Sequence, residues 1–168
     1  MGNQTIKDVL HTYSAGGLTE SVIKEATTPG NGPNVIVYDF GDNIQHGEYH
    51  METNTIRLSK DLVEHFNSIF LDGTKSDLMK YSIAITLTQT FINEFTHYGD
   101  ALDGLDAILN ENGEVVNGPI EGGMIKVYDE GNDAAKALYP FYPSDTKTGK
   151  TVGSDDLKKN PSLIPPIK

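Results

Sequence analysis

The stretch Phe91–Gly104, FINEFTHYGDALDG, closes the longest periodic segment of the chain. At 100° per residue, the pattern predicts a helix over residues 77–98 with two apolar lines along its length. Between them runs one narrow polar line, which consists of Ser82, Thr86, Gln89, Thr90, Asn93, His97 and Asp100. A helix that is apolar on two sides is largely buried, so this polar line is either paired internally or faces a cleft.

Residues 93–97 match the pattern of a zinc-peptidase helix at two positions. In that pattern, two histidines four residues apart bind the metal, and the glutamate after the first histidine polarises the metal-bound water. Glu94 and His97 stand at the glutamate and the second histidine, whereas Asn93 replaces the first histidine. A carboxamide is a much weaker zinc ligand than an imidazole. Glu94 and His97 could instead form a helical ion pair worth about 0.2–0.5 kcal/mol.

This stretch resembles the zincin metallopeptidases, especially the small bacterial metallopeptidase-like toxin domains in which an HExxH helix continues into a Tyr-Gly-Asp segment. The resemblance covers residues 35–139 and includes Tyr49–Leu58, which looks like the edge strand that precedes the active-site helix in zincins. It implies an α+β, zincin-like fold in which a small mixed sheet packs against a long motif-bearing helix.

The resemblance also implies a role for each matching residue. Glu94 would be the general base, and His97 would bind zinc together with the weakened first position, Asn93. An extended substrate would contact the strand at Tyr49 and the backbone amides near Ile56. The expected cofactor is zinc, held weakly or lost because of the asparagine.

The third metal ligand stays open among four acidic residues. Asp103 has the spacing after the motif histidine that some zincins use, and Asp100 shares the helical face of His97 if the helix continues for another turn. Asp129 and Glu130 match the downstream acidic ligand of other zincins.

Two further alternatives concern the metal. His46 and His50, near the predicted edge strand, could replace the missing imidazole, although each is more typical of an exposed strand end. Asp100, Asp103 and Asp106 would suit a calcium ion, as in a calcium-stabilised structural domain.

The composition excludes several other function classes. The chain has 168 residues and no cysteine, so any metal must be held by histidine or by oxygen ligands. Its 24 acidic and 13 basic residues give a net charge of −11, which disfavours nucleic acid and anionic membranes as partners. The most apolar stretch, residues 81–95, carries too many polar residues for membrane insertion, and no secretory signal is visible at the N-terminus.

Along the chain, we expect one domain over residues 1–143 and a surface-wrapping or disordered tail over residues 144–168. A helix over residues 18–26, with Thr19 as its cap, comes first, followed by a buried strand at residues 35–38. The remaining expected elements are extended segments at 47–51 and 55–58, helices at 60–70, 77–98 and 105–110, a short strand at 115–116, an extended segment at 124–128, and a last helix from Asn132 or Asp133 to Leu138.

The leading hypothesis is a zincin-like metallopeptidase-type toxin or effector domain that hydrolyses peptide bonds by metal-activated water. The alternative is a catalytically inactive pseudo-peptidase that serves as a protein-binding module. Expected partners are a peptide or protein substrate and an immunity protein or other protein. We expect a secreted or delivered bacterial effector that is cytoplasmic before export.

Overall fold

The computed structural model describes residues 2–43, 45–103, 108–109, 115–117, 120–121, 124–125 and 130–138. Its helices are α1 (Gly2–Tyr13), α2 (Glu20–Ala26), the short 3-10 helix η1 (Met51–Thr53), α3 (Lys60–Phe70), α4 (Asp77–Asp103) and α5 (Glu130–Leu138). Its strands are β1 (Asn34–Tyr38), β2 (Gly47–His50), β3 (Thr55–Ser59), β4 (Ile108–Leu109), β5 (Val115–Asn117), β6 (Ile120–Glu121) and β7 (Met124–Ile125). This confirms an α+β fold built around one long helix.

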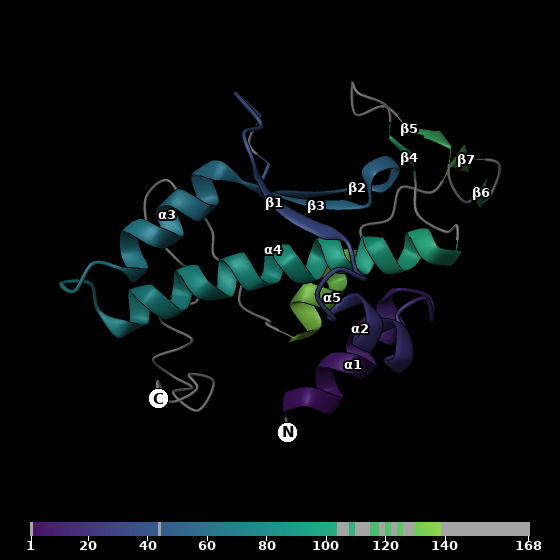
Figure 1. Cartoon of the computed structure of the whole chain (residues 1–168), viewed down its shortest axis with the longest axis horizontal. Helices are drawn as coiled ribbons and strands as arrows, with labels where there is room; N and C mark the ends of the chain where they lie inside the picture. The colour runs from purple at the N-terminus through teal and green to yellow at the C-terminus, as the bar shows by residue number, and fades with distance from the viewer. Residues whose placement is uncertain are drawn as a thin grey trace.

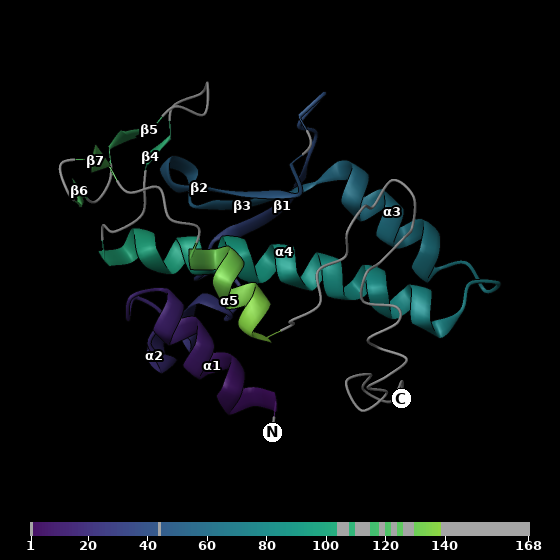
Figure 2. The same ribbon diagram turned by 180° about the vertical axis from the view of Figure 1, so that it is seen from behind.

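The long helix α4 crosses the molecule and separates two groups of elements. The sheet of β1, β2 and β3 lies on one side of α4 together with α3, and α1, α2 and α5 lie on the other side (Figure 1). The view from behind shows the same division (Figure 2). No helix in the described part of the chain is long and apolar enough to cross a membrane.

The main sheet is small and mixed, as expected. Its strand order is β1-β3-β2, with β3 parallel to β1 and antiparallel to β2. The turn from β2 to β3 runs through η1 and then Asn54, whose φ of 47° is in the left-handed region that asparagine tolerates. This order makes β3 the central strand and corrects the expectation that Ile56 lies in an edge strand.

The core lies between this sheet and α4. In β3, Ile56 and Leu58 are buried, and Tyr49 of β2 is in register with Ile56 and therefore shares its face. Ile92, Phe95 and Tyr98 of α4 belong to the same apolar cluster. The sheet therefore sits directly on the half of α4 that carries the motif.

Several predicted elements agree with the structure. The α2 helix begins after Thr19, whose hydroxyl accepts a hydrogen bond from the Val22 amide at 3.3 Å. The α3 helix has the predicted bounds. The α4 helix begins as predicted but continues for five residues beyond Tyr98, to Asp103, and the short strand expected at residues 115–116 corresponds to β5.

Other expectations were wrong. The α1 helix was missed, although Ile6, Val9, Leu10 and Tyr13 have helical spacing. Residues 108–109, expected to be helical, form β4, which pairs with β5. The β1 strand is exposed rather than buried, because it is an edge strand. The last helix begins at Glu130, and the expected tail at residues 144–168 lies outside the described residues.

Candidate active site on helix α4

The motif residues lie in the C-terminal half of α4 and differ in exposure. Glu94 and Asp100 are buried, with 7% and 3% of their surface exposed, whereas Asn93 and His97 are half-buried. Residues 93 and 97 are four apart in one continuous helix, so their side chains are neighbours on one face. Asn93 and His97, at the two histidine positions of the pattern, therefore keep their relative placement and stay partly accessible.

The edge strand β2 packs directly on Glu94, at a glycine. A side chain on Gly47 would place its Cβ 2.9 Å from Glu94 Oε1 and 2.6 Å from Thr90 Cγ2. Gly47 therefore allows the strand backbone to lie against the carboxylate with no intervening side chain. Sequence analysis missed Gly47. The feature that could have pointed to it is the presence of a glycine at the start of a predicted strand.

The α5 helix approaches the other side of the motif in the same manner. A Cβ on Gly131, the second residue of α5, would lie 2.4 Å from the Asn93 carbonyl oxygen. The two backbones are therefore in contact at the first motif position. Glu130, a candidate metal ligand, is the first residue of α5 and directly precedes Gly131. Its backbone therefore lies close to the first motif position.

A third close approach holds the end of the motif. A Cβ on Gly99 would meet Leu18 Cγ at 2.4 Å and Ser14 Cβ at 2.8 Å. Leu18 and Ser14 are fully buried, and the Leu18 amide donates a 2.8 Å hydrogen bond to the Ser14 hydroxyl. The segment between α1 and α2 is thus packed against α4 two residues after His97.

The polar line of α4 is partly paired within the helix. The hydroxyls of Thr86 and Thr90 donate to the carbonyls of Ser82 and Thr86, each at 3.0 Å. Such bonds to the preceding turn satisfy a buried hydroxyl without any external partner. The internal-pairing interpretation therefore holds for the threonines in the first part of the line, and the candidate site is confined to residues 93–100.

An aromatic contact joins β2 to α4 beside the motif. The rings of Tyr49 and Tyr98 meet edge to face with centroids 5.7 Å apart, and the Tyr49 hydroxyl donates to Asn54 Oδ1 at 3.1 Å. Burial raises the pKa of the Tyr98 hydroxyl, with a smaller contribution from the negative charge of Glu25. Tyr49, expected to contact substrate, thus lies on the edge strand and anchors it to α4.

The path of α4 separates the candidate third ligands. The helix continues through Gly99 to Asp103. Asp100 was expected to share the helical face of His97 if the helix continued for another turn, and it therefore lies on that face. In a continuous helix, position 103 is rotated by about 120° from position 97 and lies about 9 Å along the axis. This geometry favours Asp100 or an acidic residue from another element over Asp103.

The two residues expected to contact substrate, Tyr49 and Ile56, lie on different strands, β2 and β3. Ile56 is fully buried, and its position pairs with Val35 on one side and Tyr49 on the other. The backbone of this central strand is therefore engaged in the sheet and cannot receive an added strand. In the described part of the chain, β2 pairs with β3 alone and keeps one edge for a further strand.

The described side chains do not by themselves complete a metal site. Among the residues that the structure describes, no three His, Asp or Glu side chains gather in a way that could hold a metal ion. His50 donates or accepts a 3.0 Å hydrogen bond with Thr53, and alternation along β2 places it on the opposite face from Tyr49. It therefore does not replace the missing imidazole. Asp129 and Asp106 lie outside the described residues.

Comparison with known proteins assigns the family. The model of metallopeptidase toxin 3 matches residues 1–139 of the 168-residue chain. No curated protein and no solved structure gave a significant match. A metallopeptidase family implies chemistry that uses a metal and acts on a protein or peptide. From α1 to the end of α5, the chain belongs to the metallopeptidase toxin 3 family.

Proposed function

We propose that this chain is a toxin domain that hydrolyses peptide bonds, with Glu94 as the proton acceptor. The packing of Gly47 on Glu94 is the observation that carries the proposal. It puts a buried carboxylate directly beneath the edge strand where an extended peptide would be added. A binding edge and a proton acceptor in contact are two of the parts that peptide hydrolysis needs from the protein chain.

Each part has a distinct role. The outer edge of β2 would hold the backbone of the substrate at the spacing of a further strand, about 4.8 Å from β2. Glu94 would accept a proton from the attacking water at its carboxylate and give it to the leaving amine, and its burial shields one side of the reacting group from bulk water. Tyr49, held by Tyr98 and Asn54, would keep the edge strand in place.

The candidate metal ligands are Asn93, His97 and one acidic residue. We favour Glu130, because the contact between Gly131 and Asn93 brings the start of α5 to the first motif position. Asp129 and Asp100 remain alternatives. Zinc held there would polarise the scissile carbonyl as a Lewis acid. The amide at position 93 fits this donor set as its weakest member, so we expect low zinc affinity.

A second candidate function, a pseudo-peptidase that binds proteins without cleaving them, is favoured by Asn93 itself. Loss of one of three protein ligands weakens or abolishes metal binding and leaves the β2 edge intact. Under this alternative, peptide binding along β2 would persist without hydrolysis.

Zinc titration monitored by calorimetry tests the donor set without relying on activity. We expect Asn93→His to bind zinc at least tenfold more tightly than the unmodified chain, and adding His97→Ala to that variant to remove the gain. Glu130→Gln should weaken binding, whereas Asp103→Asn, the matched control, should not. An Asn93→His variant with unchanged affinity would contradict the proposed site.

A peptidase assay on an unstructured protein substrate separates the two functions. Peptide hydrolysis by the unmodified chain with added zinc should fall by about 10²–10⁴-fold in Glu94→Gln. An unmodified chain that binds but does not cleave, together with an Asn93→His variant that cleaves, would establish the pseudo-peptidase instead.

Membership of a toxin family also bears on where the domain acts. We propose that it is a bacterial effector delivered to its target, where it meets a protein substrate, and that an immunity protein or another protein binds it in the producing cell. Co-purification with a candidate partner from the producing cell, followed by loss of toxicity when both are expressed, would test this placement.

A further inference from the structure

The β1 strand exposes apolar side chains on both faces of the sheet. Val35 and Val37 have 51% and 55% of their surface exposed, and Ile36 and Tyr38 have 41% and 39%. In the parallel register, Val35 and Val37 lie beside Ile56 and Leu58 on the face that meets α4, yet only the β3 residues are buried. The helices therefore cover β3 and leave β1 uncovered.

The outer edge of β1 also lacks the features that normally protect an edge strand. In the part of the chain that the structure describes, β1 pairs with β3 alone. Its five residues, Asn34–Tyr38, contain no charged residue and no proline. Proteins usually shield such edges with lysine, proline, a bulge or a covering element, because an uncharged edge readily accepts another strand.

The surroundings of β1 are acidic, which identifies the chemistry of an occupant. Asp39 and Asp42 follow β1 and are exposed, and Asp61, the second residue of α3, is exposed two positions after Ser59, which pairs with Tyr38. Basic groups also lie near β1. Lys60 pairs with Asp39 at 3.5 Å, and Arg57, 4.6 Å from the centre of the Tyr38 ring, pairs with Glu48 at 2.8 Å. A hydrogen bond from the Gly41 amide, and then Lys60, lowers the pKa of Asp39, so it is ionised at neutral pH.

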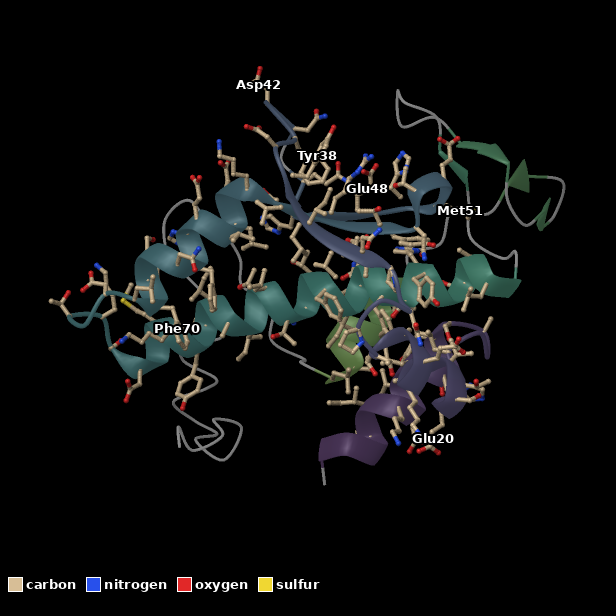
Figure 3. The ribbon with its side chains drawn as sticks, in the orientation of Figure 1. Glu20, Tyr38, Asp42, Glu48, Met51 and Phe70 are labelled. Carbon is tan, nitrogen blue, oxygen red and sulfur yellow. The ribbon has the colours of Figure 1, made fainter. Side chains whose placement is uncertain are left out.

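We propose that the β1 edge binds an extended, apolar segment of another protein that carries lysine or arginine at one end. The segment would add a strand beside β1, cover Val35 and Val37, and pair its basic end with the acidic rim that Asp39, Asp42 and Asp61 form at the C-terminal end of β1. Tyr38 and Asp42 lie on the same side of the molecule, with Asp42 farther from α4 (Figure 3). A second copy of this chain fits less well, because it would bring the same rim and a net charge of −11 to the contact.

This surface is separate from the candidate active site. The Glu94 contact is made by β2, which lies at the opposite edge of the same sheet. A partner bound at β1 would therefore leave the β2 edge open to substrate. Failure of the peptidase proposal would leave this inference intact, and the reverse also holds.

The test uses two synthetic peptides that differ only at their ends, Lys-Thr-Val-Thr-Val-Thr-Val-Lys and the same peptide with glutamate at both ends. Binding to the full chain is measured by fluorescence anisotropy at low and high salt, and hydrogen exchange locates the site. We expect the lysine peptide to bind at least tenfold more tightly, to weaken with salt, and to protect the amides of residues 34–38.

Two variants test the two components of the surface. Val37→Asp should abolish binding although it adds negative charge, whereas Leu71→Asp, an equally drastic change at an exposed residue after α3, should not. Asp39→Asn combined with Asp42→Asn should weaken binding of the lysine peptide and make that binding less dependent on salt.

Three results would overturn the proposal. These are equal or absent binding of both peptides, binding that leaves residues 34–38 unprotected, and a dimer in sedimentation velocity that Val37→Asp abolishes. The last result would assign the edge to a second copy.

Discussion

Replacing Gly47 with alanine tests the contact on which the proposed function depends. The new Cβ would lie 2.6 Å from Thr90 Cγ2 and 2.9 Å from Glu94 Oε1, whereas ordinary contacts begin near 3.4 Å. Thr90 is buried, and its hydroxyl donates a 3.0 Å hydrogen bond to the Thr86 carbonyl, so its methyl cannot turn away without loss of that bond. We therefore expect β2 to separate from α4 by roughly 1 Å, the difference between these contacts and van der Waals packing.

The cost of this separation can be bracketed. Overpacking a close contact usually costs about 1–3 kcal/mol. A loss of about 2 kcal/mol corresponds to a melting temperature roughly 4–8 °C lower for a chain of this size. Removing the opposing methyl with Thr90→Ser should return part of the loss, so the two substitutions should be coupled by about 1 kcal/mol.

Urea denaturation of the unmodified chain and four variants measures these free energies. The set consists of the unmodified chain, Gly47→Ala, Thr90→Ser and the double variant, with Gly73→Ala as the control because no atom lies within 4 Å of its added Cβ. The control should stay within about 0.5 kcal/mol of the unmodified chain. A Gly47→Ala variant as stable as this control would refute the inferred packing of β2 on Glu94.

Three further outcomes follow from the structure. Ser14→Ala leaves the buried Leu18 amide without its acceptor and should lower the free energy of unfolding by about 1–3 kcal/mol, measured with urea. Gly131→Ala places a methyl against the Asn93 carbonyl and should speed hydrogen exchange across residues 130–138; unchanged exchange would contradict the contact. Desolvation lowers the pKa of the folded-state His46 below 6.5, so its contribution to stability is complete above that pH and is lost as pH falls through the folded pKa. The difference in unfolding free energy between the unmodified chain and His46→Gln should therefore change with pH only below about 6.5.

The sequence predicts individual helices and strands well, but it predicts poorly which elements lie next to one another in the fold. The α3 bounds and the start of α4 follow from periodicity and from chain breaks, which are local properties. The exposure of β1 does not follow from local properties. The apolar run Val35–Tyr38 predicts a buried strand, whether that strand is central or at the edge of a sheet. Strand order depends on contacts between residues about 20 positions apart, such as Val35 with Ile56, and no local pattern encodes it.

The candidate site shows the same division. Glu94 and His97 stand out because of their helical spacing, which depends only on α4. Gly47 and Gly131 escaped notice, because a glycine gives no indication of which backbone will approach it. Asp103 was proposed from the spacing that some zincins use after the motif histidine, and that spacing alone does not show that α4 continues to Asp103.

These glycines also bear on whether the site was built for function. Gly47, Gly99 and Gly131 each bring a different element against α4 between Thr90 and Gly99. A purely structural seam could be filled by apolar side chains, which would stabilise it more than bare backbone does. Here the fold instead brings backbone against Glu94 and Asn93, a polar surface, from two sides. The contact at residue 93 is made by its backbone carbonyl, so Asn93→His would change one candidate ligand and leave this backbone packing in place.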